Sequence, residues 1–178
     1  MKGQQQVNKA IDSISGKTEK AQEDYQKMAG KILKQGSFPK DALGLSDGMV
    51  EGIYGQAYRL YNTGKYEDAA QLFKLLLLIN STDSKYSMGL AACFHMSKEY
   101  SSAIEVYAIC AVIDSNSPLP HYHSADCYIQ MKDRVSAVIA LEMAIKRATG
   151  KTEYKTLEDR AKMMIDRLKK ELFEDKNK

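Results

Sequence analysis

Hydrophobic and polar positions alternate with a helical period along the middle of the chain, and the pattern itself recurs. Three stretches share one order of features, namely a turn signal, an aromatic or long side chain, an alanine and a second large residue: residues 63–73, 97–107 and 132–142. Their alanines, Ala69, Ala103 and Ala137, follow one another at intervals of 34 residues. Such a period is typical of a repeated pair of antiparallel helices joined by a tight turn.

Other positions keep the same register. The turn position is held by Gly64, Lys98 and Lys132, and a small residue recurs earlier in each unit, at Ala57, Ala91 and Ala125. A single helix pair cannot cover its own apolar face, so three stacked copies form the smallest practical unit. The sequence therefore predicts an all-α solenoid of three tetratricopeptide repeats over residues 46–150. The third copy is the weakest, because Arg134 replaces the turn aromatic and no proline closes the unit.

The flanking segments predict helices that cover the ends of the solenoid. Residues 20–36 carry one apolar stripe, and residues 151–173 carry another: Ala21, Tyr25, Met28 and Ile32; then Leu157, Ala161, Met164, Leu168 and Leu172. We expect residues 1–19 and 174–178 to be flexible. The apolar run 75–79 is too short to span a membrane, and we expect it to be packed on nearly all sides as a second helix.

Charge and composition exclude several function classes. The net charge of +3 is spread thinly, and residues 37–150 carry ten basic against twelve acidic side chains. Nucleic-acid binding requires a concentrated basic face, and none is present. The first residues lack the apolar core of a secretory signal, which predicts a cytoplasmic protein. Cys93, Cys110 and Cys127 lie in apolar helical patterns, so we expect buried, reduced thiols.

A candidate binding surface follows from the repeat. First helices line the concave side of such a solenoid, and the positions one residue beyond the packing stripe face the groove. The candidate peptide-binding residues are Tyr54, Tyr58, Tyr61, Met88, His95, Tyr122 and Ile129. Ala92 and Asp126 occupy the groove positions between them. Tyrosine and methionine suit an extended peptide with apolar anchors. Tyrosines at helical spacing also pack in cores, but Ile53, Ala57 and Leu60 already occupy the stripe of this helix that faces the core.

Other chemistry has little support in the residues. The groove positions lack the cations that hold a terminal carboxylate in many tetratricopeptide co-chaperones. His121, His123 and Cys127 have the appearance of metal ligands, but supporting ligands are absent and repeat packing explains the cysteines. No phosphate loop or nucleophile motif appears, so we expect no enzyme, cofactor or metal. The stripe Gly48, Gly52 and Gly55 indicates either a close approach by another segment, subunit or ligand, or a frayed helix start.

Residues 45–145 resemble the class II chaperones of bacterial type III secretion, which look after translocator proteins. The resemblance is carried by "IYGQAYRLYNTGKYEDAAQLF", "DSKYSMGLAACF" and "PLPHYHSADCYIQMKD". It implies a cytoplasmic chaperone that binds an extended apolar segment of a secreted translocator in the concave groove and keeps it soluble and unassembled.

The resemblance also implies several further properties. Tyr54, Tyr58 and Tyr61 correspond to the aromatic groove residues of the family, and residues 20–36 correspond to the helix through which several members form homodimers. Some members also work with a transcriptional regulator, which nothing in these residues tests. The identity of the client and the dimer geometry are equally beyond the sequence. The alternative is a general scaffold or regulatory adaptor that bridges protein partners.

Overall fold

The computed structural model describes residues 43–176, and the described part is helical throughout apart from its connections. The predictions made for residues 1–42, including the helix at 20–36 and its stripe, lie outside the described residues. The elements, in chain order, are α3 (Asp47–Asn62), α4 (Tyr66–Ile79), α5 (Ser84–Met96), α6 (Tyr100–Ile113), α7 (Leu119–Gln130), α8 (Arg134–Ala148), the 3-10 turn η1 (Thr152–Tyr154) and α9 (Lys155–Lys176).

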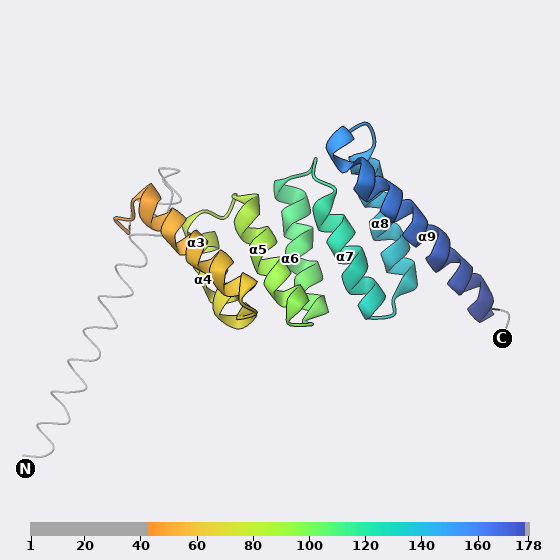
Figure 1. Cartoon of the computed structure of the whole chain (residues 1–178), viewed down its shortest axis with the longest axis horizontal. Helices are drawn as coiled ribbons and strands as arrows, with labels where there is room; N and C mark the ends of the chain where they lie inside the picture. The colour runs from red at the N-terminus through yellow and green to blue at the C-terminus, as the bar shows by residue number, and fades with distance from the viewer. Residues whose placement is uncertain (1–42, 177–178) are drawn as a thin grey trace, which may run out of the picture. The chain divides into compact units, whose positions relative to one another are not determined.

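Successive helices lie side by side in chain order, as Figure 1 shows. Helix α4 packs against α5, α5 against α6, α6 against α7, α7 against α8, and α8 against α9. Ring contacts between Tyr54 and Phe73 and between Tyr61 and Tyr66 join α3 to α4. Packing chiefly between successive helices is the geometry of a solenoid, and the predicted all-α repeat fold is confirmed.

The turns inside the three helix pairs share one backbone device. Gly64, Lys98 and Lys132 adopt φ angles of 79°, 64° and 62°. After each of them an N–H reaches back five residues, as in Lys65 N to Leu60 O at 2.9 Å, which closes a Schellman motif. These are the three turn positions predicted from the 34-residue register. Two of them place lysine in the left-handed region that glycine favours.

The core is built on the small repeat positions. The six repeat alanines are fully inaccessible to solvent: Ala57, Ala69, Ala91, Ala103, Ala125 and Ala137. Their size lets paired helices approach closely, and large side chains such as Phe73, Tyr107 and Leu141 fill the remaining space. Cys93, Cys110 and Cys127 are also buried, as expected from their packing positions.

Helix α9 covers the exposed side of the third repeat. Ala161, Ile165 and Leu168 are buried in one cluster with α8 residues such as Ala137 and Leu141. Ile165 was missing from the predicted stripe. The turn into this segment is made by Gly150, at φ 82°, in place of the absent proline. Helix α9 continues to Lys176, past the predicted end of the cap at residue 173.

The expectation that the apolar run 75–79 is packed on nearly all sides is wrong for part of the run. Leu76 and Ile79 are buried, whereas Leu78 is 73% exposed. The physical reason is that a second helix contacts its neighbours only along their shared interface, and Leu78 lies outside it. Within the described residues, no helix combines the length and apolar character needed to cross a membrane.

Candidate functional site

The predicted binding residues lie on one row of helices, which we call the first-helix face: Tyr54, Tyr58, Tyr61, Met88, His95, Tyr122 and Ile129, from α3, α5 and α7. None of them is fully buried. Tyr58 is 55% exposed, whereas the other two tyrosines of α3 are half-buried. The tyrosines therefore remain accessible while Ala57, on the neighbouring stripe of α3, is completely buried.

Tyr54 is held in place by aromatic neighbours from three helices. Its ring centroid lies 6.2 Å from that of Phe73 in an edge-on contact and 5.8 Å from that of Tyr86. Tyr58 stacks on its other side at 6.5 Å. Tyr54 is thus partly a packing residue, whereas Tyr58 presents most of its ring to solvent. An exposed aromatic ring beside a fixed one offers apolar area at a small entropic cost.

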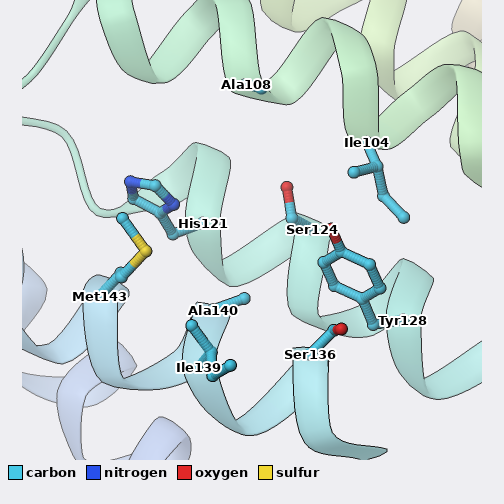
Figure 2. A pocket seen from close by; sticks show the side chains of 9 residues that line it. All are labelled: Ile104, Ala108, His121, Ser124, Tyr128, Ser136, Ile139, Ala140 and Met143. Carbon is cyan, nitrogen blue, oxygen red and sulfur yellow. The ribbon is translucent and has the colours of Figure 1, made fainter. Parts of the chain in front are cut away.

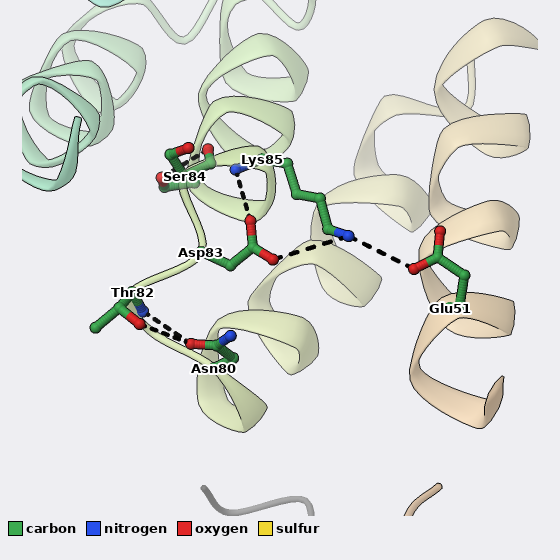
Figure 3. Close-up of polar contacts among 7 residues, drawn as sticks. Glu51, Asn80, Thr82, Asp83, Ser84 and Lys85 are labelled. Carbon is green, nitrogen blue, oxygen red and sulfur yellow. Dashed lines mark hydrogen bonds and ion pairs between the residues drawn. The ribbon is translucent and has the colours of Figure 1, made fainter. Parts of the chain in front are cut away.

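A lysine lies over this aromatic group. Lys85 Nζ is 4.8 Å from the Tyr54 ring centroid and 5.1 Å from that of Tyr86. The same atom donates to Glu51 Oε2 at 3.5 Å and lies 3.8 Å from Asp83 Oδ2 (Figure 3). Asp83 also caps α5 by accepting from Lys85 N at 3.1 Å. The ammonium group therefore links α3 to α5 at the edge of the first-helix face.

A polar network connects the second and third repeats. His95 Nε2 lies 2.9 Å from Asp126 Oδ2, and His95 Nδ1 lies 3.4 Å from the hydroxyl of Tyr107. The His123 ring stacks on Tyr107 with centroids 5.6 Å apart. Burial and the neighbouring His95 lower the pKa of His123, which favours its neutral form. His95 is therefore chiefly a connecting residue, and only 16% of its side chain is exposed.

Sequence reasoning missed the two polar links on this face. The Glu51–Lys85 pair had a detectable signal, because opposite charges stand 34 residues apart at one repeat position. The His95–Asp126 pair had a weaker one, since its separation of 31 residues does not match the period. Neither link changes the apolar character of Tyr58, Met88, Tyr122 and Ile129.

The candidate metal ligands His121, His123 and Cys127 do not gather into a metal-binding group in the described structure. Residues 43–176 contain no group of three or more histidine, cysteine or acidic side chains arranged to hold a metal ion. Burial raises the pKa of Cys93 to about 11 and that of Cys127 to about 12, so both thiols are protonated at neutral pH. These values fit side chains that pack between repeats.

Comparison with known proteins agrees with the repeat register. Residues 50–83 and 84–116 match the family model of the tetratricopeptide repeat. The low calcium response locus protein H of Yersinia pestis is 32% identical over 152 residues, which cover 84% of this chain and 90% of that protein.

Solved structures give the same result. The Yersinia enterocolitica type III secretion chaperone SycD, in complex with a peptide of the translocator YopD, is 32% identical, with a TM-score of 0.67 over 71% of this chain and 96% of that one. SycD has also been solved as an alternative dimer. PcrH in complex with the chaperone-binding region of PopD is 29% identical, with a TM-score of 0.68 over 72% of this chain and 96% of that one. The repeat register, the first-helix face and these relatives lead to one conclusion: the chain belongs to the class II translocator chaperones of bacterial type III secretion, a tetratricopeptide-repeat family.

Proposed function

We propose that this chain binds an extended, apolar segment of a translocator protein along the first-helix face and keeps that protein soluble and unassembled before export. The observation that carries the proposal is the exposed ring of Tyr58 beside half-buried Tyr54 and Tyr61. Further along the face, Met88, Tyr122 and Ile129 are half-buried and offer apolar contacts at the next two repeats. The complexes of SycD and PcrH with translocator segments support this reading over a general scaffold.

The mechanism we propose is stoichiometric binding without catalysis. Burial of a few apolar anchors lowers the free concentration of an aggregation-prone partner by mass action, and no nucleotide or cofactor takes part. We place this activity in the bacterial cytoplasm, where the partner is held before export. Tyr58 and Met88 would contact anchors directly, whereas His95 would act mainly by holding α5 against α7 through Asp126.

Replacing Tyr58 by alanine tests the binding face. Aromatic residues at the centre of an interface commonly contribute more than about 1 kcal/mol, so we expect at least about fivefold weaker binding of a translocator peptide. Calorimetric titration measures the affinity, and circular dichroism checks that the helices are unchanged. Leu78→Ala is the matched control, because it removes an apolar side chain that is even more exposed than Tyr58 from a second helix. Equal affinities for wild type and Tyr58→Ala would refute the assignment.

We also propose that residues 20–36 form the homodimer contact, on the strength of their apolar stripe and of the relatives' dimers. Met28→Glu places a charge in that stripe, so sedimentation equilibrium should shift toward the monomer. Lys27→Glu alters charge at the adjacent position and should leave the dimer intact. A dimer that persists unchanged in Met28→Glu would place the contact elsewhere.

A further inference from the structure

The second candidate site is lined by α6, α7 and α8 and shares no residue with the first-helix face. An apolar pocket of about 210 Å³ opens between α6, α7 and α8 (Figure 2). Ile139 and Met143 stand at its mouth with 53% and 43% of their surfaces exposed. Figure 2 shows His121 and Met143 together at one end of the pocket and Tyr128 at the other. Its full lining is Ile104, Ala108, His121, Ser124, Tyr128, Ser136, Ile139, Ala140 and Met143.

A basic cleft adjoins this pocket. The cleft has a volume of about 510 Å³ and shares Met143 with the pocket. Lys146, Arg147 and Lys151 line it, and no acidic side chain is among the lining residues of either cavity. Within the described part of the chain, neither Lys146 nor Arg147 forms an ion pair. The two cavities together form a surface with an apolar half and a cationic half, which we call the apolar–basic cleft.

The end of a helix explains only in part why cations line one half of the cleft. Lys146 and Arg147 lie in the last turn of α8, where positive charge interacts favourably with the helix dipole. That explanation requires only exposed charges. It leaves unexplained why Arg147 Nη1 and His121 Nε2 are both buried without any hydrogen-bond partner. Buried polar atoms are nearly always paired, and these two are not, although one residue lines the pocket and the other the adjoining cleft. Both residues are half-buried, so a rotation of either side chain brings its unpaired nitrogen to an acceptor bound in the cavities.

A carboxylate placed between the two side chains would satisfy both atoms. Arg147 Nη1 is always a donor, and His121 Nε2 donates in one neutral tautomer. Burial and the nearby Arg147 lower the pKa of His121, which favours that neutral form. A guanidinium–carboxylate contact is charge-assisted and therefore stronger than a contact with a neutral acceptor. An apolar side chain next to such a carboxylate would reach Ile139 and Met143.

We propose that the apolar–basic cleft docks an acidic, amphipathic segment of a partner protein, with its carboxylate on Arg147 and His121 and its apolar side chain in the pocket between α6, α7 and α8. Charge complementarity selects this occupant, because the lining offers three cations and no acid. The site uses none of the predicted tyrosine contacts of α3. A partner held there leaves the first-helix face open to a translocator segment.

The test is a selection from a library of random twelve-residue peptides displayed on phage. It is run in parallel on the full chain and on its Arg147→Gln, Arg160→Gln and Tyr58→Ala variants. Arg160 is an exposed α9 residue outside the cleft, so it controls for general loss of positive charge. We expect one family of peptides, with Asp or Glu near Leu, Met or Phe, on wild type, Arg160→Gln and Tyr58→Ala. That family should be absent from Arg147→Gln.

A synthetic peptide of that family gives the quantitative result. By calorimetry it should bind Arg147→Gln about tenfold more weakly than wild type, and its Glu→Gln version should lose a similar factor. Bound carboxylate should also raise the pKa of His121, measured by NMR titration of the imidazole. Arg147→Gln should melt close to wild type, since Arg147 Nη1 has no hydrogen-bond partner and the variant loses mainly the favourable interaction of a positive charge with the end of α8. If Arg147→Gln fails to fold, the same selection and calorimetry are run on Ile139→Glu. That variant puts negative charge at the pocket mouth and should lose the acidic peptides.

Three outcomes overturn the proposal. Identical peptide families on wild type and Arg147→Gln would show that the cleft recognises no carboxylate. Loss of the acidic peptides on Tyr58→Ala would assign them to the first-helix face. Self-association of the wild type that Arg147→Gln abolishes would make a second copy of this chain the occupant.

Discussion

Gly89 makes the sharpest test of the packing between the first two repeats. It lies on α5, where a β-carbon added to it would be 2.3 Å from Phe73 Cε1 and 2.4 Å from Phe73 Cζ. The Phe73 ring is 2% exposed and contacts Tyr54 edge-on, so it has little room to move. Helix propensity alone predicts that Gly89→Ala stabilises the protein by about 1 kcal/mol. Packing instead predicts that Gly89→Ala destabilises the protein.

Overpacking of this kind costs about 1–3 kcal/mol, and the buried ring places Gly89→Ala toward the upper end of that range. After the gain in propensity, we expect a net loss of about 1–2 kcal/mol. For a chain of this size, that loss lowers the melting midpoint by about 2–8 °C. Thermal denaturation followed by circular dichroism measures the midpoint, and urea denaturation gives the free energy of unfolding.

Gly55→Ala is the matched control. Gly55 also lies in a first helix, α3, but no atom lies within 4 Å of its added β-carbon. We expect Gly55→Ala to stabilise by about 1 kcal/mol. A Gly89→Ala variant as stable as wild type would refute the packing argument. Destabilisation by Gly55→Ala would instead indicate close approach by a segment or partner outside the described residues, one of the explanations offered for the glycine stripe.

Three further predictions concern the turns, the thiols and pH. Lys98→Gly should stabilise by about 0.5–1 kcal/mol in urea denaturation, because it removes left-handed strain, whereas Lys65→Gly, at φ −86°, should not. Cys93 and Cys127, whose pKa values are raised to about 11 and about 12, should resist iodoacetamide in the folded protein at about pH 8 and react after unfolding, as mass spectrometry would detect; rapid native alkylation would contradict their burial. Burial lowers the pKa of His123 below its ordinary 6.5, so its contribution to stability is complete above about pH 6.5 and is lost as pH falls through the folded value. The urea midpoint should fall between about pH 7.5 and 5.5, and less so in His123→Gln; an equal fall in both would assign the effect to other groups.

The repeat explains why most of the fold was predictable from sequence. A period of 34 residues located the six buried alanines and the positive-φ position inside each of the three helix pairs, because each copy must solve the same packing problem. Interactions that belong to one copy were not predictable. Arg134 breaks the aromatic pattern, and in the structure its Nε donates to Glu171 Oε2 of α9 at 3.0 Å. A link across 37 residues to a non-repeating helix leaves no periodic signal.

The candidate site was predictable to the same degree. Register placed Tyr58 on an accessible face, but it did not show that Tyr54 packs against Phe73 or that His95 is held by Asp126. Nor did it show the apolar–basic cleft, whose residues come from α6, the connection between α6 and α7, α7, α8 and the segment after α8. These residues come together only at the observed angle between neighbouring helix pairs. The residue pattern within one repeat does not encode that angle.

Because most packing among the described helices joins each helix to the next one along the chain, residues 43–176 have no single central core that stabilises every helix at once. Local unfolding can therefore begin at a terminal helix pair and spread inward, one helix pair at a time. A guest lying across α3, α5 and α7 would add contacts to the few polar links that join these helices directly, Lys85 to Glu51 and His95 to Asp126. Binding would then stabilise the helices of the chaperone and keep the translocator from premature assembly. The melting midpoint of the chain would therefore report whether a translocator segment is bound.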